Sequence, residues 1–259
     1  MGDKKAMEQN ERKKTLSPEE QERRRRMAAR RRRQKELERR KRKRLLVIIG
    51  IAALALVVIG LIIFLVTKFV SGGSKPIASK NGTFVIAIDP GHGGEDIGMS
   101  NEDTLEKQVT LDVCSKLKVM LEGQGCQVIL LREDDAYLSK EERVQKANES
   151  RADLLVSVHC GYSEDGSASG AVSYYKKDSK ESAYLAEMIE QALVKESGAL
   201  DGGFQEGSFS IISDTEMPAV LVEAGYISNA QEATSLADDS YQNDVAKGIA
   251  KGIIMSLEK

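Results

Sequence analysis

An apolar run that ends in a glycine-flanked histidine constrains the fold of this chain more than any other feature. Residues 83–88 are apolar or β-branched and lead into the sequence DPGHGG, which contains His92. Such a run, stopped by proline and glycine, is typical of a buried strand. The only other histidine, His159, follows a second apolar run at residues 154–158. Because ligands bind at the carboxyl ends of strands in open α/β sheets, we predict that both histidines belong to one site.

Predicted strands and helices alternate along residues 83–259. Apolar runs predict strands at residues 84–88, 127–131, 154–158, 171–175 and 219–222. Helical periodicity and helix-end signals predict helices at residues 105–122, 139–150, 181–195 and 244–257. Strands that alternate with helices indicate a single α/β domain with a largely parallel sheet. A domain of about 175 residues is large enough to bury a proper core.

The N-terminal part has a different composition. Residues 1–44 hold 20 Lys and Arg against 8 Asp and Glu, a net charge of +12, so with the whole chain at −2 the remainder carries −14. This segment has almost no large apolar residues, which predicts a largely disordered tail. Residues 45–67 contain no charged residue, and about 20 apolar residues suffice for a helix to cross a bilayer. We therefore predict an uncleaved transmembrane helix at 45–70 and a flexible linker at 71–82.

The charge on either side of the span predicts its orientation. Lysines and arginines are concentrated before it, and only Lys68, Lys75 and Lys80 follow closely. By the positive-inside rule the N-terminus is cytoplasmic, and the C-terminal domain lies outside the cell membrane. The basic tail would then contact the anionic inner leaflet. Nucleic acid is another possible partner for such a run, but the adjoining span makes it the less favoured one.

Two carboxylates are candidates for the same site as the histidines. Glu223 directly follows the apolar run 219–222, where a carboxylate is costly unless it is paired or bound to a metal. Glu106 stands at a helix start, which the helix dipole alone would explain. Two imidazoles and one carboxylate form the three-ligand set that holds catalytic zinc and leaves a fourth position open. The remaining carboxylate could act as a general base.

Five motifs in order resemble those of the zinc-dependent N-acetylmuramoyl-L-alanine amidases of the family 3 type. The resemblance covers roughly residues 84–257. It rests on DPGHGG at 89–94, Glu106-Lys107, the residues Arg132, Arg143 and Asn148, the run ADLLVSVH ending at His159, and PAVLVEAGYISN at 218–229.

The resemblance implies a fold, an activity and roles for the site residues. It implies a mostly parallel six-stranded sheet flanked by helices, and cleavage of the amide between N-acetylmuramic acid and L-alanine in peptidoglycan. His92, Glu106 and His159 fall on the family's Zn²⁺ ligands, and Glu223 falls on its catalytic glutamate. Because all four residues are present, a catalytically dead, wall-binding copy is disfavoured. A zinc peptidase that cuts the stem peptide is the runner-up, and an activator protein is not predicted either way.

Two further features bear on the site. Residues 160–170 are too few for the inhibitory helix that some members of the family carry, so we expect an open cleft. The three cysteines, Cys114, Cys126 and Cys160, are an odd number, so at least one is unpaired or pairs between molecules. A bridge between Cys114 and Cys126 is one possibility, and we expect Cys160 to be a passive small residue rather than a nucleophile.

Overall fold

The computed structural model describes residues 76–257 continuously, together with six isolated residues between 22 and 39. Most of the predicted basic tail, the predicted span at 45–70 and residues 71–75 of the predicted linker lie outside the described residues. In the part of the chain that the structure describes, no helix is both long enough and apolar enough to cross a membrane. Residues 76–82, predicted as linker, contact the domain: Ile77 is buried, and its backbone N–H donates to the Ser256 carbonyl at 2.9 Å.

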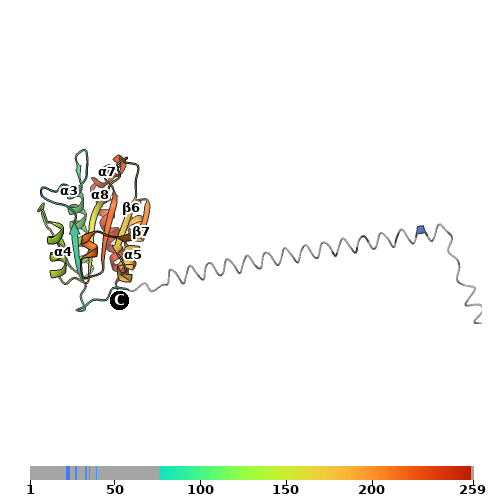
Figure 1. Ribbon diagram of the computed structural model, residues 1–259, viewed down its shortest axis with the longest axis horizontal. Helices are drawn as coiled ribbons and strands as arrows, with labels where there is room; N and C mark the ends of the chain where they lie inside the picture. Colours follow the sequence, from blue (N-terminus) through green and yellow to red (C-terminus); the bar gives the residue numbers. More distant parts are fainter. Residues whose placement is uncertain are drawn as a thin grey trace, which may run out of the picture. The chain divides into compact units, whose positions relative to one another are not determined.

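A six-stranded sheet forms the centre of the domain (Figure 1). Its strands, in spatial order, are β4 (Gln127–Leu130), β1 (Val85–Pro90), β5 (Leu154–Gly161), β8 (Ala219–Tyr226), β6 (Ala171–Lys176) and β7 (Asp201–Gly207). The first four are parallel; β6 runs antiparallel to β8, and β7 runs parallel to β6. The predicted mostly parallel six-stranded sheet is thus confirmed. Because β1, β5 and β8 point the same way, their carboxyl ends share one edge of the sheet.

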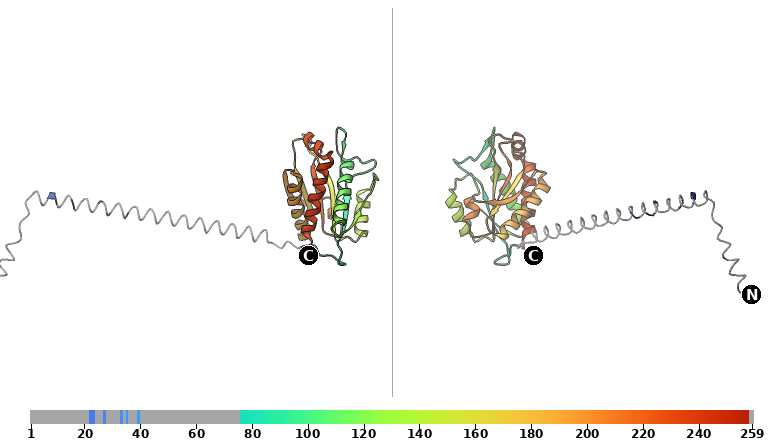
Figure 2. Two further views of the ribbon diagram at one scale, coloured as in Figure 1. Left: turned by 180° about the vertical axis from the view of Figure 1, so that it is seen from behind. Right: turned by 45° about the vertical axis from the view of Figure 1, so that its right-hand side comes forward.

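Helices cover both faces of this sheet (Figures 1 and 2). One layer consists of α3 (Glu106–Glu122), α8 (Asp239–Ser256) and α5 (Lys180–Ser197), and the left view of Figure 2 shows α8 between the other two. The opposite face carries α4 (Lys140–Glu149) and the short α6 (Ser210–Ser213). Helix α7 (Ala230–Leu236) follows β8, and a small hairpin of β2 (Ser100–Asn101) and β3 (Thr104–Leu105) precedes α3.

The close packing of α8 against α5 depends on two glycines. A Cβ atom on Gly252 would lie 2.3 Å from the Ile189 Cα, and one on Gly248 would lie 2.5 Å from the Leu193 Cα. Both distances are shorter than any real carbon contact. Only hydrogen at these positions lets the two backbones approach, which explains two glycines in the interior of a long helix despite their poor helix propensity.

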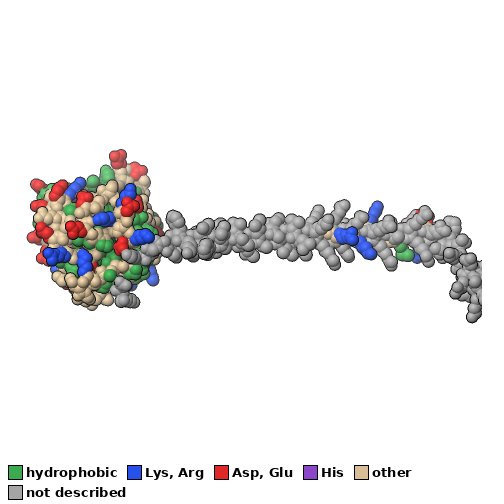
Figure 3. Space-filling view, turned by 60° about the horizontal axis from the view of Figure 1, so that its bottom comes forward, with side chains coloured by type: hydrophobic (Ala, Val, Ile, Leu, Met, Phe, Trp, Pro, Cys, Tyr) green, Lys and Arg blue, Asp and Glu red, His purple; other side chains and the backbone are tan. Residues whose placement is uncertain are grey.

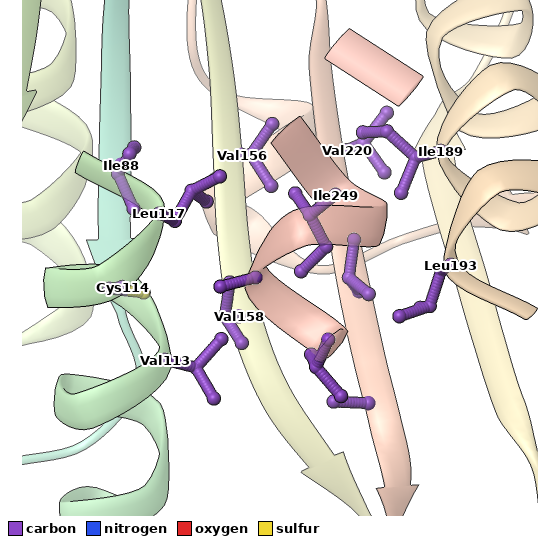
Figure 4. Close-up of a cluster of buried hydrophobic side chains, with 14 of the residues drawn as sticks. Ile88, Val113, Cys114, Leu117, Val156, Val158, Ile189, Leu193, Val220 and Ile249 are labelled. Atoms are coloured by element: carbon purple, nitrogen blue, oxygen red, sulfur yellow. The ribbon is translucent and has the colours of Figure 1, made fainter. Parts of the chain in front are cut away.

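The main core lies between the sheet and the three-helix layer (Figure 4). Ile88, Val156 and Val220 come from three adjacent strands, while Leu117 and Ile249 come from α3 and α8. These side chains have no solvent exposure, and full burial of each stabilises the fold by roughly 1.5–3 kcal/mol. A smaller apolar cluster, which includes Leu155, Leu221 and Ile212, packs on the opposite face under α4 and α6.

Local capping explains where two helices begin. Ser139 caps α4 through a reciprocal pair of hydrogen bonds with Glu142, as the predicted start at Ser139 requires. Helix α8 begins at Asp239, five residues before the predicted start at 244, because the Asp238 side chain accepts from the Tyr241 backbone N–H. The prediction followed the apolar stripe, which starts later than the cap.

The sequence-based prediction does not include β7, α6, α7 or the β2–β3 hairpin. Strand β7 has the sequence DGGFQEG and lies mostly exposed at the sheet edge, so it carries no apolar alternation. Strands β5 and β8 also extend past their predicted ends at 158 and 222. Each extension begins with a charged or titratable residue, His159 or Glu223, and contains a glycine, which interrupts the apolar pattern but not the hydrogen-bonded ladder.

One face of the described domain carries mixed charge (Figure 3). On the face in Figure 3, acidic and basic side chains are interspersed. This face therefore has no continuous basic stripe of the kind that binds nucleic acid.

Candidate active site

The turn after β1 presents His92 in an unusual backbone conformation. His92 has φ of 61°, in the left-handed region that non-glycine residues rarely occupy. Its imidazole faces His159 on β5, and the two ring centroids lie 4.9 Å apart in an edge-on arrangement. The residue before it must be glycine, because a Cβ atom on Gly91 would lie 2.4 Å from the His159 ring. The predicted convergence of the two histidines is confirmed.

Glu106 joins the two histidines from the first turn of α3. Its Oε1 lies 3.1 Å from His92 Nε2 and 3.0 Å from His159 Nδ1. The backbone N–H groups of Cys160 and Met99 donate to its two carboxylate oxygens at 2.9 and 2.8 Å. The side chain is 2% exposed. Its position is therefore fixed by four contacts from three separate segments, which a helix-dipole acid would not need.

Glu106 and His92 stabilise each other's charged forms at this centre. Burial works to raise the pKa of Glu106, but hydrogen bonds and charge interactions with His159 and His92 hold that pKa well below its usual range. Burial likewise works to lower the pKa of His92, but Glu106 and Asp96 together raise it. Asp96 Oδ2 lies 2.9 Å from His92 Nδ1 and so orients the ring. No periodicity or motif in the sequence indicates a role for Asp96.

These three side chains fit a metal ion. One ligand atom from each of His92, Glu106 and His159 can be chosen so that all three lie within 4.8 Å of one another. Two imidazole nitrogens and a carboxylate oxygen are a donor set that catalytic zinc uses. The Asp96 contact to the far nitrogen of His92 is the outer-shell partner that metal-bound histidines commonly have.

Glu223 lies beside this centre on β8. It pairs with His159 of β5 in the parallel register and lines the same cleft. Burial raises the pKa of Glu223, while the charge of His159 and, to a smaller extent, the nearby Tyr174 hydroxyl on β6 oppose that rise. Phe209 packs edge-on against Tyr174 with 5.2 Å between ring centroids. Glu223 is thus a half-buried carboxylate that lies next to the three candidate metal ligands but outside their cluster.

The site opens into a cleft of about 720 Å³. Asp89, Arg143 and Glu223 are among its polar lining residues, and Tyr137, Tyr162 and Phe209 are exposed aromatic residues at it. The segment between β5 and β6 contains no helix. In the described part of the chain, nothing corresponds to an inserted helix between these strands, in line with the expectation of an open cleft.

Two motif residues serve the structure around the site. The buried Arg132 donates to the carbonyls of Pro90, Gly91 and Lys107 at 2.8–2.9 Å. Asn148 lies further away and accepts from the Glu216 backbone N–H at 2.8 Å. Neither side chain belongs to the group of possible metal ligands.

The cysteines form no disulfide. Cys114 and Cys160 are buried and Cys126 is partly buried, all as free thiols. The possible bridge between Cys114 and Cys126 is therefore absent. Burial raises the pKa of the Cys160 thiol well above its usual range, and a thiol held in its protonated form is a poor nucleophile. This agrees with a passive role for Cys160 next to His159.

The fold and the site define a class of protein: a single α/β domain with a candidate two-histidine, one-glutamate metal centre at the edge of its sheet. Comparison with known proteins identifies the family within that class. The sequence profile described as N-acetylmuramoyl-L-alanine amidase matches residues 86–255. The chain belongs to this family of amidases.

Individual relatives agree with that assignment. The chain is 34% identical over 190 residues to N-acetylmuramoyl-L-alanine amidase LytC of Bacillus subtilis, a match that covers 73% of this chain but only 38% of LytC. It is 34% identical to the germination-specific N-acetylmuramoyl-L-alanine amidase of the same organism, over 70% of this chain and 81% of the relative. A crystal structure of an N-acetylmuramoyl-L-alanine amidase from Clostridium difficile 630 superposes with a TM-score of 0.65 at 32% identity, covering 67% of this chain and 96% of that one.

Proposed function

We propose that this protein is a membrane-anchored, zinc-dependent amidase of the cell wall. It hydrolyses the amide bond between N-acetylmuramic acid and the L-alanine of the stem peptide in peptidoglycan. The observation that carries the proposal is the convergence of His92, Glu106 and His159, with Glu223 beside them, in one cleft. The family to which the chain belongs supplies the substrate class.

The residues divide the chemistry between them. His92, Glu106 and His159 would hold the zinc ion, which would supply Lewis-acid chemistry for the hydrolysis. Glu223 accepts a proton from the attacking water and delivers it to the departing amine of L-alanine. Proton transfer by such a positioned group accelerates a reaction by roughly 10²–10⁴-fold. The raised pKa of Glu223 suits a group that must both accept and release a proton.

The N-terminal segment gives the proposed location. The uncharged run at 45–67 and the +12 tail before it support a single-pass anchor with a cytoplasmic N-terminus. The catalytic domain then lies outside the cytoplasm, where peptidoglycan is. Because Ile77 already packs on the domain, only the few residues between the span and Ile77 tether it, and its reach is limited to wall material near the membrane.

Product analysis tests the activity. The full-length protein in detergent micelles is incubated with purified peptidoglycan, with and without a chelator, and the soluble products are analysed by mass spectrometry. We expect stem peptides with free L-alanine amino termini and intact glycan strands, a release that the chelator stops and added zinc restores. Cleavage within the stem peptide would instead identify a zinc peptidase, and glycan fragments would identify a different class of hydrolase.

A further inference from the structure

Two buried arginines hold the backbone of the turn that carries His92. Three consecutive carbonyl groups, those of Pro90, Gly91 and His92, all accept hydrogen bonds from guanidinium groups. Arg132 contacts the first two carbonyls, and Arg143 contacts the first and the third. The turn therefore has a fixed shape that does not depend on a bound ion.

Arg143 is the residue that reaches His92 itself. It projects from the first turn of α4, and its Nη2 donates to the His92 carbonyl at 2.6 Å. Its Nη1 donates to Pro90 at 2.8 Å and to Asp89 Oδ1 at 2.6 Å, and its Nε donates to Leu138 at 3.2 Å. Four donor contacts to the protein leave little capacity for substrate in a group with five N–H donors. The guanidinium thus acts on the turn, although it borders the cleft.

The conformation at His92 needs such support. A left-handed φ of 61° is sparsely populated for a residue with a side chain, and such residues persist only where their surroundings hold them. The direction of the imidazole follows from this backbone conformation. If the carbonyl were released, the peptide could relax to a commoner conformation and the ring would turn away from Glu106 and His159.

The salt bridge behind Arg143 fixes it in turn. Asp89 has no solvent exposure, and its second oxygen accepts from the Ser157 hydroxyl at 2.8 Å. The Arg143 side chain is 8% exposed. Because the pair is buried and Ser157 holds the other carboxylate oxygen, its geometry is fixed, and the position of α4 is transmitted to the metal-site turn through Asp89 and Arg143.

From this geometry we infer that Arg143 is a positioning residue that sets metal affinity by holding His92 in its left-handed conformation. The inference rests on the proposed function for the identity of the metal, but its conformational part concerns the protein alone. It assigns to a motif residue a role that is neither ligand nor substrate contact.

The test uses two variants and a matched control in the full-length protein in micelles. Arg143→Lys keeps a positive charge beside Asp89 but lacks the forked group that reaches the His92 carbonyl. Asp89→Asn combined with Arg143→Met removes both charges together, so neither is left buried alone. Lys146→Met is the control: it lies on the same helix and loses a contact to the Leu131 carbonyl, but it does not touch the turn.

The first readout needs no metal. The chain has only two histidines, so selective ¹³C and ¹⁵N labelling of histidine gives two backbone signal sets. In metal-free protein we expect the His92 Cα and Cβ shifts of Arg143→Lys to leave the left-handed range, while His159 and the control stay unchanged. A His92 that keeps its left-handed shifts in both Arg143 variants would overturn the inference.

The second readout is the zinc dissociation constant, from competition with a chromophoric chelator at a temperature where every variant is folded by circular dichroism. Loss of an outer-shell partner typically weakens metal binding 10- to 100-fold, and we expect that loss in both Arg143 variants and less than a twofold change in Lys146→Met. Unchanged zinc affinity in folded Arg143 variants would contradict the inference. Failure of the wild-type protein to bind zinc would instead defeat the proposed metal site, and the histidine shifts would still decide the conformational role.

Discussion

Glu223 of β8 lies directly opposite His159 of β5 in the parallel register of the sheet. Paired residues on adjacent strands are about 5 Å apart and point to the same face. Asp89 and Leu221 lie on that face too, by the alternation along β1 and β8, and both line the cleft. The spacing between the proposed base and a proposed zinc ligand is therefore set by the sheet, which makes it insensitive to loop motion.

Glu106→Ala should lower zinc content and activity together. The substitution removes the carboxylate that contacts both histidines and leaves two imidazoles as ligands. We expect substoichiometric zinc after dialysis and partial recovery of activity in excess zinc, because the remaining ligands still bind weakly. Metal analysis of the dialysed protein checks the first point. Full zinc occupancy in this variant would show that Glu106 is not a ligand.

Tyr174→Phe should change the pH dependence of catalysis. The Tyr174 hydroxyl stabilises the charged form of Glu223 and so lowers its pKa. Without the hydroxyl the pKa of Glu223 rises, and the acidic limb of kcat/KM moves to higher pH. Activity at a pH below the limb should fall several-fold, while the plateau at higher pH changes little. A pH profile of soluble muropeptide cleavage measures this, and a limb that moved toward lower pH would contradict the effect of Tyr174 on the Glu223 pKa.

Much of the site could be predicted from the sequence, but its supporting contacts could not. His92 and His159 were placed together because each follows an apolar strand, and strand ends in a parallel sheet meet at one edge. Glu106 looked like a helix-start acid, and only the family resemblance indicated a ligand. Asp96 and Tyr174 have no periodic or spacing signal. Asp96 lies near the site because the chain turns after His92, and Tyr174 lies near it because β6 pairs antiparallel with β8.

Glu190→Gln should remove a pH-dependent loss of stability. Glu190 on α5 is 2% exposed, and one of its oxygens has no partner among the described residues, while the other accepts from Ser173. Burial raises its pKa from 4.5 to about 7. Between these two pH values the folded state therefore holds a proton that the unfolded chain has lost. The contribution of Glu190 to the free energy of unfolding is thus complete below pH 4.5 and declines as the pH rises through 7. The full loss corresponds to up to about 3 kcal/mol.

Urea unfolding at several pH values checks that sign. Relative to wild type, Glu190→Gln should gain stability as the pH rises from about 4.5 to about 7, and the difference should level off above that pH, because glutamine carries no charge to bury. The partly exposed Glu187→Gln on the same helix serves as a control and should track the wild type. A difference between wild type and Glu190→Gln that did not vary with pH would rule out a protonated Glu190.

The proposed anchor predicts protease accessibility. In wall-less cells, protease added outside should remove the domain at 76–257 and leave an epitope placed in residues 1–44 intact. Replacing two leucines within 45–67 by lysines should release the protein from the membrane fraction, because charges at mid-membrane disfavour insertion by several kcal/mol. An externally digested N-terminal epitope would reverse the proposed orientation.

The most direct test of the whole account is the behaviour of Glu223→Gln, measured for zinc content and turnover on the same preparation. Glutamine keeps the shape and hydrogen bonding of Glu223 but cannot accept the proton. We predict about one zinc per chain, as in the wild type, and hydrolysis of peptidoglycan lower by at least 10²-fold. Turnover near the wild-type rate, or loss of zinc from Glu223→Gln while Glu106→Ala stayed loaded, would contradict the division of roles between the two glutamates.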